Sequence, residues 1–350
     1  MFVCYQEAPT YSVDQLQQRV QVEPFAEALK RIWYTNSAEG VIAHYVASPP
    51  LAREIQAQEH VVNTDDRNLL EYSFARSLIS EHKFGTDQIM ALASRRQLSL
   101  PEQLVGKLDI PKVDDERLLF FAGRLQRFAI PERMQGEVRN RALAIQAYIN
   151  TDYATVLRNW KGEAESPMAR LMMAEAVAYV GSPEEANAVI GRIEHDWPVD
   201  AELTAALVAA RNGAPDVAAD HLRAAFTVCR QHPWVRPRLL DTGMELAQRL
   251  ASQDPRLAQM MFDVSGQPLA AGLWELPRAE LRAVLARNLP APEQLQAVMD
   301  CEPYVPWSRD FLEFRLSVYR ATKSPSAELA ARDLAEYLRH ADKTFEEASQ

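Results

Sequence analysis

Apolar residues recur every three or four positions over most of this chain, with short polar or proline-containing turns between the periodic segments. Steps of three and four residues place side chains on one face of an α-helix, so from about residue 77 onward the pattern predicts successive helices. Three further helices are predicted nearer the N-terminus, starting at Ser12, at Glu23-Pro24 and at Ser37. Serine can cap a helix N-terminus, and proline suits the first helical turn.

Two short segments depart from this helical pattern. Phe2–Gln6 is rich in strand-forming residues, and Leu69–Phe74, which follows a polar turn, can form a second short strand. The predicted fold class is therefore mainly α, with a short α+β segment followed by a solenoid or bundle of α-hairpins. The predicted domains are an α+β segment over 1–80, a helical connector over 81–135, and helical hairpin repeats over 136–350.

The helical region contains an internal repeat with an offset of 32 residues. Small residues allow close helix approach, glycine can end a helix in the left-handed conformation, and proline can begin the next helix. Weaker hairpins are predicted around Ala142 and Ala154, and over about 233–264, 277–300 and 308–340. The coinciding pairs are Ala174/Ala206, Ala178/Ala210, Gly181/Gly213, Pro183/Pro215 and Ala186/Ala218.

This spacing resembles the tetratricopeptide repeat (TPR), a helical hairpin whose stacked copies form surfaces that hold proteins or peptides. The resemblance implies a protein- or peptide-binding scaffold that is not catalytic on its own. The alternative from the same residues is a generic bundle of α-hairpins.

Composition narrows the classes of function. A net charge of −10 disfavours a broad nucleic-acid interface, which needs a clustered positive field. Only 12 glycines occur, never in a cluster, which disfavours a nucleotide-binding α/β fold. Three distant cysteines, Cys4, Cys229 and Cys301, predict reduced thiols rather than a disulfide framework. Since neither a signal peptide nor a membrane span is recognisable, we expect a cytoplasmic location.

A group of short motifs lies along Tyr11–Arg76. They are Glu23-Pro24-Phe25 with Ala28-Leu29, Glu39-Gly40 with Ala43-His44-Tyr45-Val46-Ala47, Asn63-Thr64-Asp65-Asp66-Arg67, Glu71-Tyr72 and Phe74-Ala75-Arg76. Together they resemble the C-terminal part of bacterial spermidine synthase-like (polyamine aminopropyltransferase-like) proteins in which that domain precedes tetratricopeptide repeats. The resemblance implies that 1–80 is the remnant of such a domain, with substrate-binding residues at Asn63, Thr64, Asp65, Asp66, Arg67, Glu71 and Tyr72.

The catalytic apparatus implied by this resemblance is missing from the chain. The family has a glycine-rich turn for decarboxylated S-adenosylmethionine and an aspartate base, and neither motif occurs here. We therefore predict no catalytic residue and no cofactor in this chain. The alternative function is an aminopropyltransferase-like fragment or subunit that needs a separate methyltransferase-like catalytic domain, in cis or in trans. Asp65 and Asp66 can also be explained as ordinary turn residues.

Other candidate chemistry lies in the helical region. Histidines at the i, i+4 spacing of a helical metal pair are absent, and consecutive Glu194-His195-Asp196 diverge around a helix, so no metal site is predicted.

Basic residues at Arg230, Arg236 and Arg238 could form a groove for an acidic peptide terminus, or could be solvated helix ends. A second basic run spans Arg278–Arg287. We expect the tryptophans near hairpin turns to fill gaps between hairpins: Trp160, Trp197, Trp234, Trp274 and Trp307.

Overall fold

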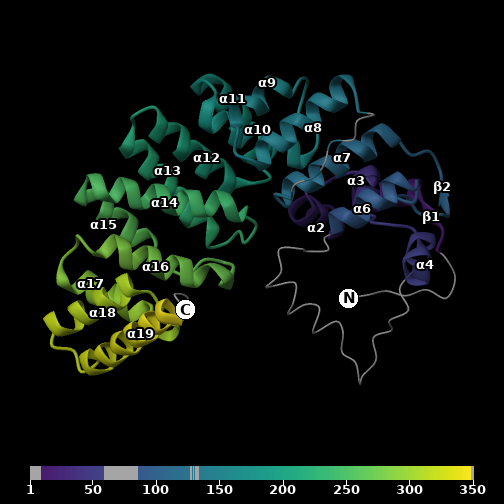
Figure 1. Ribbon diagram of the computed structural model, residues 1–350. Helices are drawn as coiled ribbons and strands as arrows, with labels where there is room; N and C mark the ends of the chain where they lie inside the picture. The colour runs from purple at the N-terminus through teal and green to yellow at the C-terminus, as the bar shows by residue number, and fades with distance from the viewer. Residues whose placement is uncertain (1–8, 59–85, 127, 129, 131–133, 348–350) are drawn as a thin grey trace. The chain divides into compact units, whose positions relative to one another are not determined.

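The computed structural model describes residues 9–58, 86–126, 128, 130 and 134–347, and these residues are mainly helical (Figure 1). The chain divides into two compact units, Met1–Ala176 and Val177–Gln350. In the described ranges, no helix has both the length and the apolar character needed to cross a membrane. The predicted fold class is thus confirmed at the level of a mainly α protein.

The first unit starts with short elements and continues into longer helices. Its elements are β1 (Tyr11–Ser12), α1 (Val13–Arg19), α2 (Phe25–Ala28), the π-helical η1 (Leu29–Trp33), α3 (Ala38–Ala43), α4 (Pro49–Gln58), α6 (Thr86–Arg95), β2 (Leu104–Val105), α7 (Ile110–Gly123), α8 (Gly136–Ile149), α9 (Tyr153–Asn159) and the first part of α10 (Pro167–Val180).

Serine caps begin two of these helices, as predicted. Ser12 accepts a hydrogen bond from the Gln15 amide at 3.3 Å, and Ser37 accepts one from the Gly40 amide at 3.1 Å. Each bond satisfies an amide that a helix N-terminus otherwise leaves without a partner. The predicted strands Phe2–Gln6 and Leu69–Phe74 lie outside the described residues.

A parallel pair of two-residue strands, β1 and β2, was not predicted from the sequence. Tyr11 lies opposite Leu104, and the Tyr11 amide donates to the Gln103 carbonyl at 2.8 Å. Near this pair, α3 packs on α7 through Ile42, Ala43 and Val113. The partly buried side chains around that core are Leu16, Leu100, Leu104 and Leu108.

The second unit consists of successive helical hairpins. Its elements are the end of α10, α11 (Pro183–Ile193), α12 (Pro198–Arg211), α13 (Pro215–Cys229), α14 (Pro237–Gln253), α15 (Pro255–Val264), the 3-10 turn η2 (Gly272–Trp274), α16 (Glu275–Ala286), α17 (Ala291–Asp300), the 3-10 turn η3 (Glu302–Tyr304), α18 (Arg309–Ala321) and α19 (Ala327–Glu347). From α11 to α19, helices adjacent in sequence pack on one another, and so do α12 with α14, α13 with α15, and α14 with α16.

The turn chemistry at the internal repeat follows the prediction in part. Pro183 and Pro215 each lie in the first turn of a helix, and Ser182 and Glu185 form a capping box at the start of α11. Gly213 has φ +72°, the left-handed conformation expected for a glycine that ends a helix. Gly181 does not adopt it: a Cβ there would lie 2.4 Å from Cγ1 of Val177, so close packing explains this glycine instead.

The tryptophans do not all fill gaps between hairpins. Trp160, Trp197 and Trp274 are buried, which confirms the expectation for them. Trp234 and Trp307 are 42% and 51% exposed, so the expectation was wrong for these two. Both lie in segments that join one hairpin to the next, where proline neighbours mark the turn but do not fix the direction of the indole.

Candidate functional site

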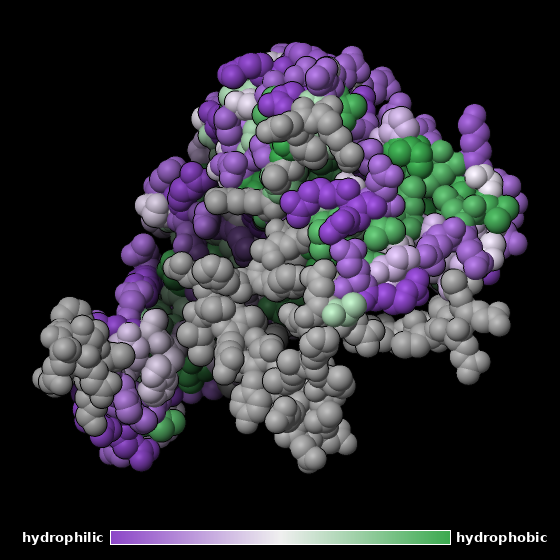
Figure 2. Space-filling view, turned by 45° about the vertical axis from the view of Figure 1, so that its right-hand side comes forward, coloured by the Kyte–Doolittle hydropathy of each residue, from purple (hydrophilic) through white to green (hydrophobic). Residues whose placement is uncertain are grey.

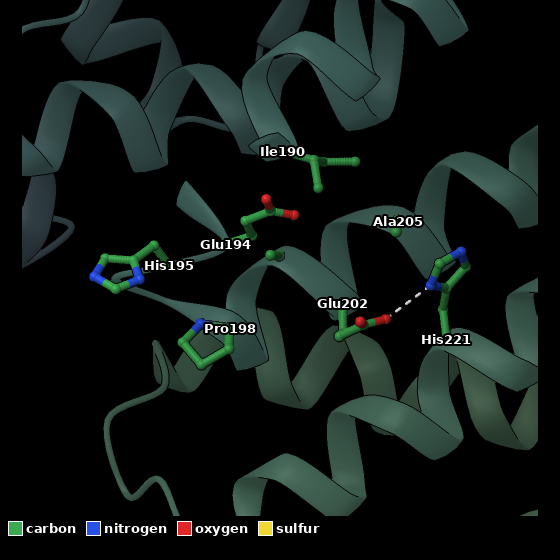
Figure 3. A pocket seen from close by; sticks show the side chains of 8 residues that line it. Ile190, Glu194, His195, Pro198, Glu202, Ala205 and His221 are labelled. Carbon is green, nitrogen blue, oxygen red and sulfur yellow. Dashed lines mark hydrogen bonds and ion pairs between the residues drawn. The ribbon is translucent and has the colours of Figure 1, made fainter. Parts of the chain in front are cut away.

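An open pocket lies on the second unit, between α11, α12 and α13 (Figure 3). Its volume is about 460 Å³. Two successive hairpins contribute to it, because α11 supplies one wall, α12 the floor and α13 the other wall. It is lined by Ile190, Glu194, His195, Pro198, Ala201, Glu202, Ala205 and His221.

Helix periodicity explains why these side chains share one pocket. Pro198 begins α12, and Ala201 and Ala205 follow on the same face at i+3 and i+7, with Glu202 beside them. Alanines at these positions leave space above the helix that larger side chains would fill. Glu194 caps the C-terminal end of α11. The pocket is therefore a product of small residues on one helix flanked by polar residues on its neighbours.

The charged side chains of the pocket are Glu194 and Glu202. Nδ1 of His221 lies 2.8 Å from Oε2 of Glu202, and an ionised carboxylate can only accept in this bond, so Nδ1 is the donor (Figure 3). Both partners are partly solvated, with side-chain exposures of 37% and 34%, so the pair adds little stability and mainly orients the carboxylate. Figure 3 shows the His195 ring directed away from this pair.

The predicted basic groove is not assembled as a free surface. Nε of Arg236 donates to Oδ1 of Asp200 at 2.7 Å, and both side chains are buried. Nη2 of Arg230 donates to the Val264 carbonyl at 2.5 Å, at the C-terminal end of α15. Arg238 is half-buried in the first turn of α14. Arg236 and Arg230 thus hold helices together, a role that the sequence pattern did not separate from peptide binding.

Two arginines of the second basic run, Arg278 and Arg282 of α16, also point inward. Arg278 donates to Glu275 and, at 2.6 Å, to the carbonyl of Ser265. Nη1 of Arg282 lies 2.8 Å from Oδ2 of Asp300, and its guanidinium lies over the Phe262 ring at 4.2 Å. These arginines are therefore structural cations rather than solvated helix ends.

Arg315 of α18 has the most enclosed guanidinium of the second unit's described residues. It donates to both carboxylate oxygens of Glu302, at 2.8 and 3.0 Å, and to Asp333 at 2.5 Å. Burial by itself lowers the pKa of Arg315, but hydrogen bonds to Glu302 and Asp333 outweigh this and raise it. Tyr319 also donates to Glu302. This group joins η3, α18 and α19.

Two buried acids lie in the first unit. Burial raises the pKa of Glu116 in α7 to about 7, against the opposing effects of Lys112 and Thr35. Glu175 in α10 is buried and accepts hydrogen bonds from the hydroxyls of Tyr148 and Tyr153 at 2.8 and 2.7 Å. Neither acid lines the pocket, so we assign both to packing between helices.

The cysteines of the second unit are buried thiols. Burial raises the pKa of Cys229 to about 11 and that of Cys301 to about 12. Among the residues described, no group of three His, Cys, Asp or Glu side chains could hold a metal ion. The residues expected to bind substrate by resemblance, Asn63, Thr64, Asp65, Asp66, Arg67, Glu71 and Tyr72, lie outside the described ranges.

The chain matches no protein-family model, no curated protein sequence and no solved structure. The site must therefore be interpreted from its own geometry. That geometry offers hydrogen-bond acceptors, two imidazoles and an apolar floor on an open face of the hairpin array.

Proposed function

We propose that this chain is a protein- or peptide-binding scaffold built from tetratricopeptide-like helical hairpins. The observation that supports it most is the pocket itself. Three helices from two successive hairpins line it, with small and apolar residues on its floor and polar side chains around them. Stacked hairpins that expose such a surface commonly hold a segment of another protein, since each added hairpin extends the same face.

The architecture of the second unit favours a rigid binding surface. Ion pairs and arginine–carbonyl bonds join helices in different hairpins, as in the pair of Arg236 with Asp200 and the bond from Arg230 to Val264. A surface fixed before binding loses less conformational entropy when a partner docks. This supports binding rather than a purely structural spacer.

The test is to recover partners with the full chain from an extract of the source organism and to map protection by hydrogen exchange. We expect at least one partner that slows amide exchange over helices of the second unit. If every recovered protein leaves exchange over Val177–Gln350 unchanged, the proposed function is wrong.

A second candidate follows from the motifs between Glu23 and Arg76. In it, the chain is the downstream part or subunit of an aminopropyltransferase-like enzyme whose catalytic domain is separate. The full chain would then show no aminopropyl transfer to a diamine alone and would gain it with a methyltransferase-like partner domain. Transfer by the chain alone would contradict the prediction that it has no active site.

A further inference from the structure

The pocket of α11, α12 and α13 presents acidic groups that the described residues do not neutralise. Glu194 makes no side-chain hydrogen bond or ion pair with any residue of the described part. Glu202 uses Oε2 for His221, while its Oε1 makes no hydrogen bond there. The lining includes no lysine and no arginine. A cation supplied from outside would therefore find acceptors on two sides of the pocket.

Three other acids of this unit show a different arrangement. Asp200, Asp300 and Glu302 each have an arginine within ion-pair distance, and these three arginines are buried. In these pairs the charge of the acid is neutralised by a residue of the same fold. The two glutamates of the pocket, by contrast, have no arginine or lysine partner among the residues that line it.

The floor of the pocket suits the stem of a long side chain. Ile190, Pro198, Ala201 and Ala205 give it an apolar surface between the glutamates. Arginine and lysine bury their methylene groups on such surfaces while the charged end reaches polar partners. A compact cation without a stem would leave this apolar lining uncovered.

From this geometry we propose that the pocket holds the arginine side chain of a partner protein's segment, an inference that rests on the proposed scaffold function. A guanidinium has five donors in one plane and can bond two carboxylates at once, whereas an ammonium acts as a point charge. The occupant is part of a protein because the pocket is open. An open pocket covers only part of a small ligand, and flanking peptide contacts on the neighbouring helices add the remaining affinity.

The test uses the full chain and four fluorescein-labelled peptides of alanine and serine, identical except for a central arginine, citrulline, lysine or glutamate. Citrulline has the shape of arginine without its charge. Fluorescence anisotropy up to millimolar concentration should show the arginine peptide binding about ten-fold more tightly than the citrulline peptide. The glutamate peptide should bind more weakly still.

The variant E194Q/E202Q should lose this preference for arginine. A matched control, E245Q/E280Q, removes two negative charges from exposed positions on α14 and α16 and should keep it. Circular dichroism melts of both variants identify any loss of folding, and the single variants E194Q and E202Q serve where the double variant unfolds.

Three outcomes of the peptide experiments would overturn the inference. They are equal binding of the arginine and citrulline peptides, a preference that survives E194Q/E202Q, and tighter binding of free spermidine than of the arginine peptide. A recovered partner that protects other helices of the second unit but not α11–α13 would also overturn it, while the proposed scaffold function would stand. If no recovered partner slows amide exchange over the second unit, the proposed scaffold function itself is wrong.

Discussion

Arg236 and Asp200 form a buried ion pair, with 2.7 Å between Nε and Oδ1, although 36 residues separate them in the chain. The arginine precedes α14 and the aspartate lies in the first turn of α12, so the pair joins two hairpins. Its side-chain exposures are 8% and 1%. A charge this enclosed is costly unless its partner is present, which gives the first prediction.

Removal of one member should destabilise the protein strongly. We expect R236A and D200A each to lower the free energy of unfolding by about 3–5 kcal/mol, because each removes one charge of a buried ion pair. Urea unfolding of the full chain measures this. The exposed control R249A should change the value by less than about 0.5 kcal/mol. Equal, small effects of R236A and R249A would contradict the buried pair.

The buried carboxyl of Glu116 should make stability depend on pH. Its pKa rises from 4.5 to about 7 on folding, so between these values the folded state binds more protons than the unfolded state. Stability from this group is therefore greatest at low pH and falls as pH rises toward 7, by a total of roughly 3 kcal/mol. E116Q should remove this part of the dependence between pH 5 and pH 8, as measured by unfolding at both values.

The matched control for Glu116 is E163Q, at an exposed position of the same unit. In E163Q, the free energy of unfolding should change between pH 5 and pH 8 by as much as it does in the parent protein. If E116Q shows the same change in the free energy of unfolding between pH 5 and pH 8 as the parent protein, the raised pKa of Glu116 is contradicted.

The two glycines of the internal repeat should respond differently to alanine. G213A should cost about 1 kcal/mol because φ +72° is strained for a residue with Cβ, and G213N should cost less since asparagine tolerates this conformation. G181A should cost about 1–3 kcal/mol through the clash with Val177.

A double-mutant cycle separates these two causes. V177A provides room for the new methyl group, so G181A/V177A should be more stable than the sum of the single changes. V177A should give no such coupling with G213A. Equal coupling in both cycles would show that Gly181 is not limited by packing against Val177.

The buried thiols should react slowly with alkylating reagents. Burial raises the pKa of Cys229 to about 11, which lowers the thiolate fraction at pH 8 by roughly a hundred-fold relative to a thiol at the ordinary value of 9. In a C4S background, mass spectrometry should find Cys229 and Cys301 modified rapidly only after urea unfolding. Rapid labelling of the folded protein would contradict their burial.

Local chemistry made much of the helical pattern predictable. Ser12, Ser37, Pro183 and Pro215 begin helices where the sequence indicated, because caps and first-turn prolines act over a few residues. The same rules could not distinguish Gly181 from Gly213. One glycine is fixed by its own backbone angle and the other by a side chain four residues away.

The roles of the arginines depended on long-range contacts. The pattern marked Arg236 as a polar surface residue because its partner lies in another hairpin. A signal was nevertheless present in Asp200, which stands three residues before Leu203 and seven before Leu207, on the buried stripe of α12. Arg315 likewise lies four residues from Phe311 and from Tyr319 on an apolar stripe. A charge on such a stripe indicates a paired interior group.

The pocket was less predictable. Ala201 and Ala205 resemble the alanines that pack against neighbouring helices elsewhere in the repeat. Both line the pocket, although Ala201 is buried and only Ala205 is partly exposed, because of the spacing of α11 and α13 above α12, and no local pattern encodes that spacing. Glu194 and His195 stood out in the sequence as adjacent polar residues, but that adjacency did not indicate that both line a pocket with Glu202 and His221.

The arginine bonds to helix ends have a consequence for how such an array can change over evolution. Arg211 of α12 donates to carbonyls at the end of α10, and Arg230 of α13 to one at the end of α15. Deletion of one hairpin would therefore remove the arginine that donates hydrogen bonds to the terminal carbonyls of another. An inserted hairpin would separate the donor from its acceptor. The hairpins are not interchangeable modules, so we expect the lineage to preserve their number and order while the residues of the open pocket vary.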